Sequence, residues 1–359
     1  MHTRTRRFLA FLACLPILAA LTWFAFPRSA TQPTRPQTPR APLPYGVEQV
    51  VVEHAGLRLA GTLTVPAGAG PHPAIVLIPG AGETDRDGSL FGHQFYLVLA
   101  DDLTRRGFAV LRSDKRGLGQ SGGDFASATS LDFAADIEAA AAFLRKRPGI
   151  DAGRLGLVGH SEGAMIGSLV AARDPGIAFL VLMAGNGIPA SEMFLARTRR
   201  QIRVQDLAQE LALQRAVFAA VTAPGSDAER EAAVRTLYLA AQDRHGRAFS
   251  DDEVAALLTP WMRTLLAIDP QASLRQLRCP VLALVGEKDQ VVTASENIPA
   301  LEQALGANPK AQVRRLPGLN HFFQNAKTGE LSEAAQIEET MSPQALALIG
   351  AWITRQAAK

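Results

Sequence analysis

A Gly-x-Ser-x-Gly pentapeptide at residues 159–163 constrains the fold of this 359-residue chain more than any other feature. The apolar run 154–158 leads directly into it, and a helix-like run follows it. A strand, a sharp turn and a helix in this order expose a serine hydroxyl above a sheet and leave the next backbone N–H free to bind an oxyanion. The sequence therefore predicts a nucleophile at Ser161 and an oxyanion donor in the N–H of Glu162.

A second match to the same pattern lies at residues 119–123 and contains Ser121. It follows a polar stretch, 114–117, and runs into another, 124–127. Neither a strand directly before it nor a helix directly after it is predicted. We therefore interpret Ser121 as a loop residue.

The partners of a catalytic serine can be found from their order in the chain. In hydrolases with a nucleophile elbow, an acid and then a histidine follow the serine. Among the seven histidines, His321 alone lies beyond the last apolar strand candidates. The run 280–285 is typical of a buried parallel strand and ends in Gly-Glu-Lys-Asp. We predict Asp289 as the orienting acid and His321 as the general base, with Glu287 as the fallback acid.

A second oxyanion donor should come from the loop after an earlier strand. The apolar run 74–78 ends in Pro-Gly-Ala-Gly at residues 79–82. Small residues there let the backbone approach the reacting carbonyl group. The sequence predicts the N–H of Ala81 as this donor.

These motifs together resemble the α/β-hydrolase superfamily, in its bacterial carboxylesterase and serine-aminopeptidase-like branch. Four segments carry the likeness beside the pentapeptide, and they are residues 80–88, 114–121, 286–292 and 318–322. The likeness extends from Tyr45 to the end of the chain. It implies a serine hydrolase that cleaves carboxylic esters through an acyl-enzyme intermediate. One departure is Pro79 at the start of the oxyanion loop, where many relatives have a histidine.

The order of the remaining elements predicts an α/β fold. A hairpin at 47–65 is followed by strands that alternate with helices, which is typical of a mostly parallel sheet covered on both faces. We expect the eight-stranded sheet of the α/β-hydrolase fold. Residues 188–271 have helical periodicity and no strand candidate, which predicts a helical cap inserted after the sixth strand. Such a cap should cover the active site and select substrates.

The N-terminus has the pattern of an export segment. Three arginines precede an apolar run, so we expect a signal or membrane anchor over residues 1–26 and a Pro-rich linker over 27–44. The catalytic domain should then span 45–359. No good small-x-small cleavage pair precedes Ala30, which favours an uncleaved anchor, with the enzyme on the periplasmic side of the inner membrane. Cleavage would instead give a secreted enzyme.

Charge and composition exclude several classes of partner. Six of the 37 basic residues lie in the first 40 positions, where no acid occurs, which leaves 31 basic against 34 acidic residues in the rest. The folded domain therefore has no excess of positive charge for nucleic acid. No zinc, calcium or dinucleotide motif is present, so we expect no metal or cofactor. The two cysteines, Cys14 and Cys279, are not expected to pair.

Three functions remain open from the sequence. An esterase for small or medium acyl esters is the first, and an aminopeptidase or amidase of the same fold is the second. The aminopeptidase would need buried acids to hold an ammonium group, and acids and arginines are about equally frequent in the predicted cap. The third is a non-catalytic binding protein. The substrate in the first two cases is a small-molecule ester or amide.

Overall fold

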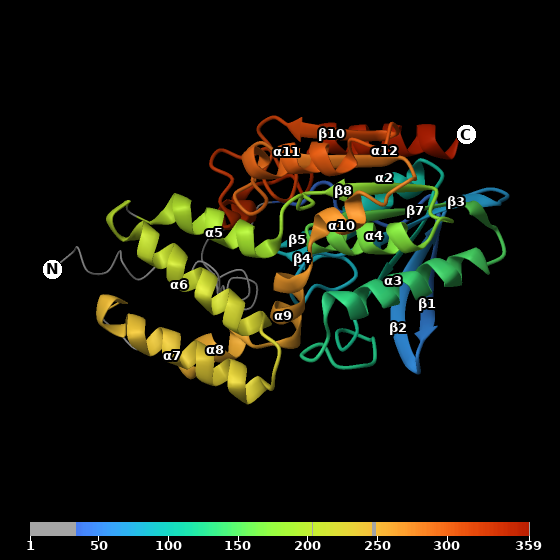
Figure 1. Ribbon diagram of the computed structural model, residues 1–359. Coiled ribbons are helices and arrows are strands. Elements are labelled where there is room, and N and C mark those ends of the chain that lie inside the picture. The colour runs from blue at the N-terminus through green and yellow to red at the C-terminus, as the bar shows by residue number, and fades with distance from the viewer. Residues whose placement is uncertain (1–33, 203, 246–248, 359) are drawn as a thin grey trace. The chain divides into compact units, whose positions relative to one another are not determined.

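The computed structural model describes residues 34–202, 204–245 and 249–358. Within these residues the central sheet has eight strands in the order β1-β2-β6-β3-β7-β8-β9-β10. Figure 1 labels β1, β2, β3, β7, β8 and β10 of this sheet. The strands are β1 (Gly46–His54), β2 (Leu57–Val65), β3 (His72–Ile78), β6 (Ala109–Ser113), β7 (Ile150–His160), β8 (Phe179–Met183), β9 (Val281–Gly286) and β10 (Ala311–Leu316). Strand β2 runs antiparallel to β1 and β6, and all other neighbours are parallel. A separate two-stranded hairpin is formed by β4 (Ser89–Leu90) and β5 (His93–Gln94).

Helices cover both faces of the sheet because the side chains of its central strands are apolar on both sides. Ile75 and Leu77 of β3 belong to a core that includes Trp352. Alternate residues of the same strand, Val76 and Ile78, line a cavity of about 30 Å³ on the opposite face. The first face is covered by α2 (Phe95–Arg105) and α12 (Pro343–Ala357), and the second by α3 (Ser130–Arg145) and α4 (Glu162–Arg173). The helix α10 (Pro270–Leu274) precedes β9, α11 (Ala294–Leu305) follows β9, and the 3₁₀ helix η2 (Leu331–Gln336) follows β10.

This architecture confirms the predicted α/β-hydrolase fold. The sequence predicted eight strands but did not indicate which residues form the eighth, β10. Its residues read Ala-Gln-Val-Arg-Arg-Leu, and Arg314 and Arg315 are exposed on it. It lies at the edge of the sheet, where charged residues prevent further pairing and interrupt the apolar run that marks a buried strand.

Residues 189–269, with the short segment 126–130, form a compact helical unit. Its helices are α5 (Ala190–Gln201), α6 (Val204–Thr222), α7 (Asp227–His245), α8 (Asp251–Leu257) and α9 (Pro260–Ala267). They enclose a hydrophobic core of their own that contains Phe194, Phe218 and Tyr238. The boundaries lie close to those expected for the cap. The role of this unit as a cover for the active site stays a prediction.

The linker expected over 27–44 is partly docked on the catalytic unit. The guanidinium group of Arg35 donates hydrogen bonds to four backbone carbonyl groups, those of Phe91, Gly92, Ala335 and Ile337. The amide of Gln37 donates to the carbonyl of Met341 at 2.7 Å and accepts from the N–H groups of residues 340 and 341. Arg35 and Gln37, which belong to the expected linker, are therefore hydrogen-bonded to the catalytic unit.

The predicted signal or anchor at 1–26 lies outside the described residues. Within the ranges that are described, no helix is both long and apolar enough to cross a membrane.

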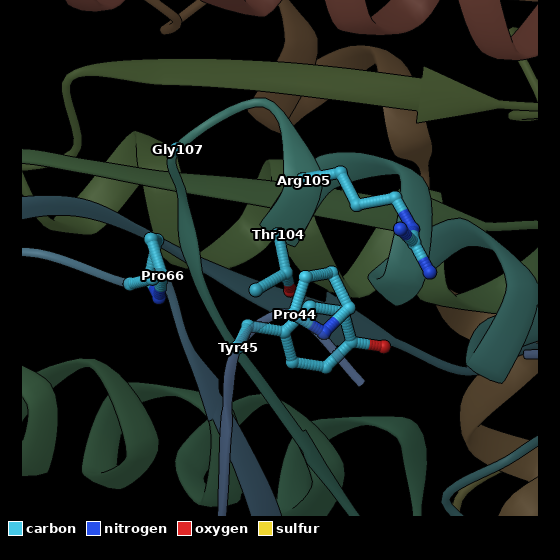
Figure 2. Close-up of a pocket in the computed structure, with 7 residues that line it drawn as sticks. Pro44, Tyr45, Pro66, Thr104, Arg105 and Gly107 are labelled. Atoms are coloured by element: carbon cyan, nitrogen blue, oxygen red, sulfur yellow. The ribbon is translucent and has the colours of Figure 1, made fainter. Parts of the chain in front are cut away.

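A surface pocket of about 370 Å³ lies where the linker enters the sheet (Figure 2). Pro44, Tyr45, Pro66, Thr104 and Arg105 are among the residues that line it. None of the predicted catalytic residues lines this pocket, so we consider it no part of the candidate active site.

Candidate active site

Ser161 lies on a strained turn between β7 and α4. Its backbone has φ 57° and ψ −120°, a conformation that costs a non-glycine residue about 1–3 kcal/mol. The N–H of Ser161 donates to the carbonyl of Met183 at the end of β8, at 2.8 Å, which holds the turn against the sheet. The strained serine at the start of α4 is the arrangement expected for a nucleophile elbow.

The two glycines of the pentapeptide are required by close packing of the backbone. A Cβ at Gly159 would lie 2.1 Å from the carbonyl oxygen of Gly163. A Cβ at Gly163 would lie 2.2 Å from the carbonyl oxygen of Ile78, at the end of β3. Only residues without a side chain allow α4 to begin so close to the neighbouring strand.

Asp289 and His321 are brought together at the carboxyl end of the sheet. Nδ1 of His321 lies 2.8 Å from Oδ2 of Asp289, and both side chains are buried. The other oxygen, Oδ1, accepts the N–H groups of Val291 and Val292, each at 2.8 Å. These two donors fix the carboxylate, so that its second oxygen holds the imidazole ring.

The fallback acid, Glu287, points elsewhere. Its side chain is exposed and accepts the N–H of Gly318 at 2.9 Å. The preceding Gly286 lets the histidine loop pack on the end of β9, because a Cβ there would lie 2.3 Å from the carbonyl oxygen of Leu319. Glu287 thus shapes the loop that carries His321 and does not contact the histidine ring.

His160 connects the elbow to the histidine loop. Its Nε2 lies 2.9 Å from the carbonyl oxygen of His321, and the two rings are 4.8 Å apart between centroids. Burial lowers the pKa of His160 to about 3, so its ring is neutral and donates this hydrogen bond through Nε2. The structure gives no hydrogen bond between the side chains of Ser161 and His321, a contact that is often long in enzymes without substrate.

The turn 79–82 lies directly against the elbow. A Cβ at Gly80 would be 3.2 Å from the Cβ of Ser161. The N–H of Gly80 donates to Oη of Tyr96 at 2.9 Å. Among the described residues, the N–H of Ala81 has no hydrogen-bond partner, and the N–H of Glu162 belongs to the first turn of α4. Both predicted oxyanion donors therefore lie on the elements that flank the serine.

Sequence reasoning missed three residues that shape this region, namely Tyr96, Lys115 and His160. Lys115 could have been noticed, because it is a charged residue two positions after the end of a buried strand, β6. Tyr96 lies inside an amphipathic helix and gives no such signal.

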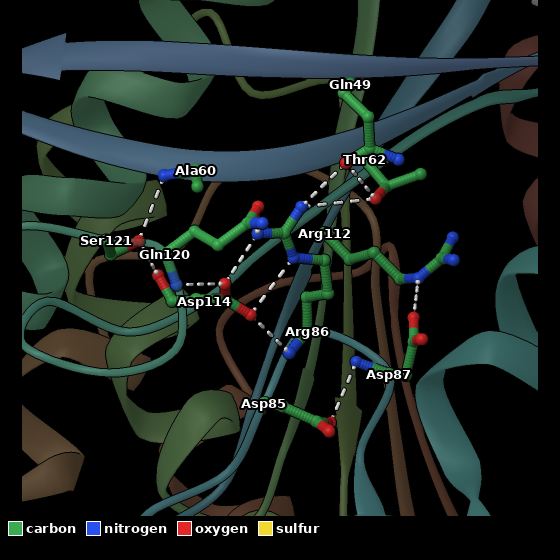
Figure 3. A network of polar contacts seen from close by, with 10 residues as sticks. All are labelled: Gln49, Ala60, Thr62, Asp85, Arg86, Asp87, Arg112, Asp114, Gln120 and Ser121. Atoms are coloured by element: carbon green, nitrogen blue, oxygen red, sulfur yellow. Dashed lines mark hydrogen bonds and ion pairs between the residues drawn. The ribbon is translucent and has the colours of Figure 1, made fainter.

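A polar network fixes the loops that follow β3 and β6 (Figure 3). The guanidinium of Arg86 forms two hydrogen bonds to the carboxylate of Asp114, at 3.0 and 2.5 Å, and Asp114 also accepts the N–H groups of Arg86 and Gln120. Burial opposes the charge on Asp114, but these donors hold its pKa below the ordinary value. Ser121 joins the same region, since its hydroxyl donates to the carbonyl of Asp114 and accepts the N–H of Ala60. Its position in a loop is confirmed.

Comparison with known proteins places the chain in a family. A family model described as "Serine aminopeptidase, S33" matches residues 70–327, which is more than half of the chain. The chain belongs to this family. The resemblance predicted from the sequence motifs is thereby confirmed.

Individual relatives include esterases. Esterase EstD of Thermotoga maritima is 25% identical over 265 residues, which cover 74% of this chain and 58% of that protein. The chain thus spans less than two thirds of that relative. A solved structure of Est1E from Butyrivibrio proteoclasticus with bound ferulic acid is similar with a TM-score of 0.53 and 17% identity, covering 86% of this chain and all of that one. The Pyrococcus furiosus esterase Pf2001 gives a TM-score of 0.54 at 14% identity, with 92% and 100% coverage. These two structures support the fold.

Proposed function

We propose that this protein is a serine hydrolase of carboxylic esters, with Ser161 as nucleophile, His321 as general base and Asp289 as the acid that orients it. The observation that carries the proposal is the 2.8 Å contact between Nδ1 of His321 and Oδ2 of Asp289, at the same end of the sheet as the strained turn of Ser161. A histidine that donates through Nδ1 presents an unprotonated Nε2, which is the form that accepts a proton from a serine hydroxyl.

The reaction follows from these positions. Nε2 of His321 accepts the hydroxyl proton while Oγ of Ser161 attacks the ester carbonyl carbon. The N–H groups of Ala81 and Glu162 stabilise the oxyanion of the tetrahedral intermediate. Collapse of this intermediate releases the alcohol, which takes the proton from His321, and leaves an acyl group on Ser161. Water, deprotonated by His321, then attacks the acyl-enzyme. The resulting tetrahedral intermediate expels Oγ of Ser161, which takes this proton back from His321, and the acid is released.

An ester substrate is supported by the relative named Esterase EstD. An amide substrate is the second candidate, since the family description names a serine aminopeptidase. The two candidates share the nucleophile and differ in the leaving group, so one substrate panel distinguishes them. Turnover of acyl esters without measurable turnover of aminoacyl amides supports the esterase. Turnover of aminoacyl amides that is lost when their α-amino group is blocked supports the peptidase.

The nucleophile is tested by two matched serine variants. Ser161→Ala should abolish turnover and labelling by a fluorophosphonate, with a loss of several orders of magnitude in kcat. Ser121→Ala should retain turnover, because that hydroxyl connects a backbone N–H of β2 to the backbone carbonyl of Asp114. A fluorophosphonate adduct on Ser121, or equal loss in both variants, would contradict the assignment.

We also propose that residues 1–26 export the enzyme and keep it at the outer side of the inner membrane. The basic residues before the apolar run support this orientation. The full chain should then sediment with membranes. A mature N-terminus near Ala30 would show that the segment is cleaved and would overturn the anchor.

A further inference from the structure

A buried lysine, Lys115, lies beneath the turn that carries the predicted oxyanion donor. Its side chain is 4% exposed, and its ammonium group lies 4.7 Å from the ring centroid of Phe133 and 5.8 Å from that of Phe125. Burial lowers the pKa of this ammonium group, and the carboxylate of Glu162 opposes the shift. A buried charge is costly and is retained where it has well-placed partners.

Within the described residues, the hydrogen-bond and ion-pair partners of the Lys115 ammonium group belong to the two elements that flank the nucleophile. Nζ donates to the carbonyl oxygen of Gly80 at 2.6 Å and to that of Gly82 at 3.2 Å. It also lies 3.5 Å from Oε2 of Glu162, the residue after Ser161. One ammonium group therefore connects the turn after β3 to the first residue of α4.

The geometry of the peptide bond gives these contacts a consequence. The carbonyl group of Gly80 and the N–H of Ala81 belong to one planar trans peptide and point in opposite directions. A donor that holds the carbonyl oxygen on one side therefore aims the N–H away from itself. A hydrogen bond to the carbonyl also polarises the peptide and makes its N–H a stronger donor. Oη of Tyr96 holds the preceding N–H, that of Gly80, so the turn is restrained on both sides.

We propose that Lys115 is a positioning residue for oxyanion stabilisation: it orients the peptide whose N–H, on Ala81, binds the oxyanion, and it ties this turn to Glu162. The inference rests on the proposed function. Lys115 acts through the backbone and does not touch the substrate. The network between Arg86 and Asp114 supports it, because it fixes the chain immediately before the lysine.

The test separates positioning from stability with three variants. Lys115→Met removes the ammonium group and with it the ion pair to the buried carboxylate of Glu162. Lys115→Met/Glu162→Leu removes both charges while keeping the backbone N–H of residue 162, which should recover much of the lost stability. Arg116→Met is the matched control, since Arg116 is the next residue and pairs with Asp132 and Asp136 on α3.

The measurements are kcat, KM, thermal stability and the inhibition constant of a trifluoromethyl ketone, which forms a tetrahedral adduct with a catalytic serine. Both variants that lack Lys115 should lose about 10²-fold in kcat, the effect of one oxyanion donor, with little change in KM. Inhibitor affinity should weaken in parallel. Arg116→Met should change the melting temperature and leave kcat near the wild-type value.

Two outcomes would overturn the inference alone: a wild-type kcat in Lys115→Met, or recovery of kcat together with stability in the double variant. The second would show that the lysine only stabilises the fold. The proposed function would be overturned if the wild-type enzyme showed neither turnover nor inhibitor binding that is lost in Ser161→Ala. This inference would fall with it.

Discussion

The hydrogen bonds of Asp289 lead to a specific expectation for the Asp289→Asn variant. Oδ1 accepts two backbone N–H groups, from Val291 and Val292, whereas Oδ2, as far as the described residues go, is bonded to Nδ1 of His321 alone. An asparagine should keep its oxygen on the two N–H donors, because the opposite orientation would place an NH₂ group against both of them. Its NH₂ group must then face the histidine.

An NH₂ donor opposite Nδ1 selects the tautomer with hydrogen on Nε2, which cannot accept the serine proton. The same substitution in a Ser-His-Asp enzyme lowers kcat by about 10⁴, and 10³ to 10⁴ corresponds to about 4–5.5 kcal/mol of activation free energy. We expect a loss of this size for Asp289→Asn. The free energy of unfolding should fall by only about 1–3 kcal/mol, the worth of one charge-assisted hydrogen bond.

Steady-state kinetics on a p-nitrophenyl ester and urea unfolding measure the two effects. Glu287→Gln is the control, because its carboxylate binds the N–H of Gly318 and should leave kcat near that of the wild type. A near-native kcat in Asp289→Asn, or a larger loss in Glu287→Gln, would refute the assignment of the acid.

Three further predictions concern stability. Gly163→Ala should prevent normal folding of the elbow, since its Cβ would lie 2.2 Å from a backbone oxygen. Gly122→Ala is the control and should fold normally, because no atom lies closer than 3.7 Å to its Cβ. Far- and near-UV circular dichroism spectra of the two variants measure the difference in folding. Removal of residues 1–33 should leave the melting temperature of the catalytic domain unchanged. Removal of 1–44 should lower it, because the hydrogen bonds of Arg35 and Gln37 are then lost. Equal melting temperatures would show that these hydrogen bonds do not stabilise the domain. Burial lowers the pKa of His93 from 6.5 to about 4, so between these pH values the unfolded chain binds a proton that the folded chain does not. The free energy of unfolding should therefore fall as pH drops from about 6.5 to about 4. Urea unfolding at several pH values should show a smaller fall for His93→Gln than for the wild type, and an equal fall would contradict this.

The family and most of the sheet could be predicted from local patterns. Buried parallel strands are short apolar runs, and turns at their carboxyl ends carry glycine, serine and acids, so β3, β7 and β9 were recognisable without the fold. Strand β10 was not, because an edge strand needs few apolar residues. The docked segment was also missed. Arg35 and Gln37 lie among prolines that predict an extended linker, and their partners are more than 50 residues away.

What the sequence determined by itself was the order of strands and helices and the residue types at the strand ends, because these depend on periodicity and on neighbours in the chain. It predicted Asp289 as the acid, with Glu287 as the fallback. Only the tertiary structure shows that two N–H donors turn the Asp289 carboxylate towards His321, whereas the carboxylate of Glu287 is exposed and binds the N–H of Gly318. The place of Lys115 was likewise decided by tertiary structure. A lysine after a strand is usually solvated. Only the parallel pairing of β3 with β6 and the packing of α4 against β3 place the ammonium group of Lys115 on the carbonyl groups of the turn after β3. Hydrogen bonds between distant segments depend on how the sheet is assembled, and no local pattern encodes them.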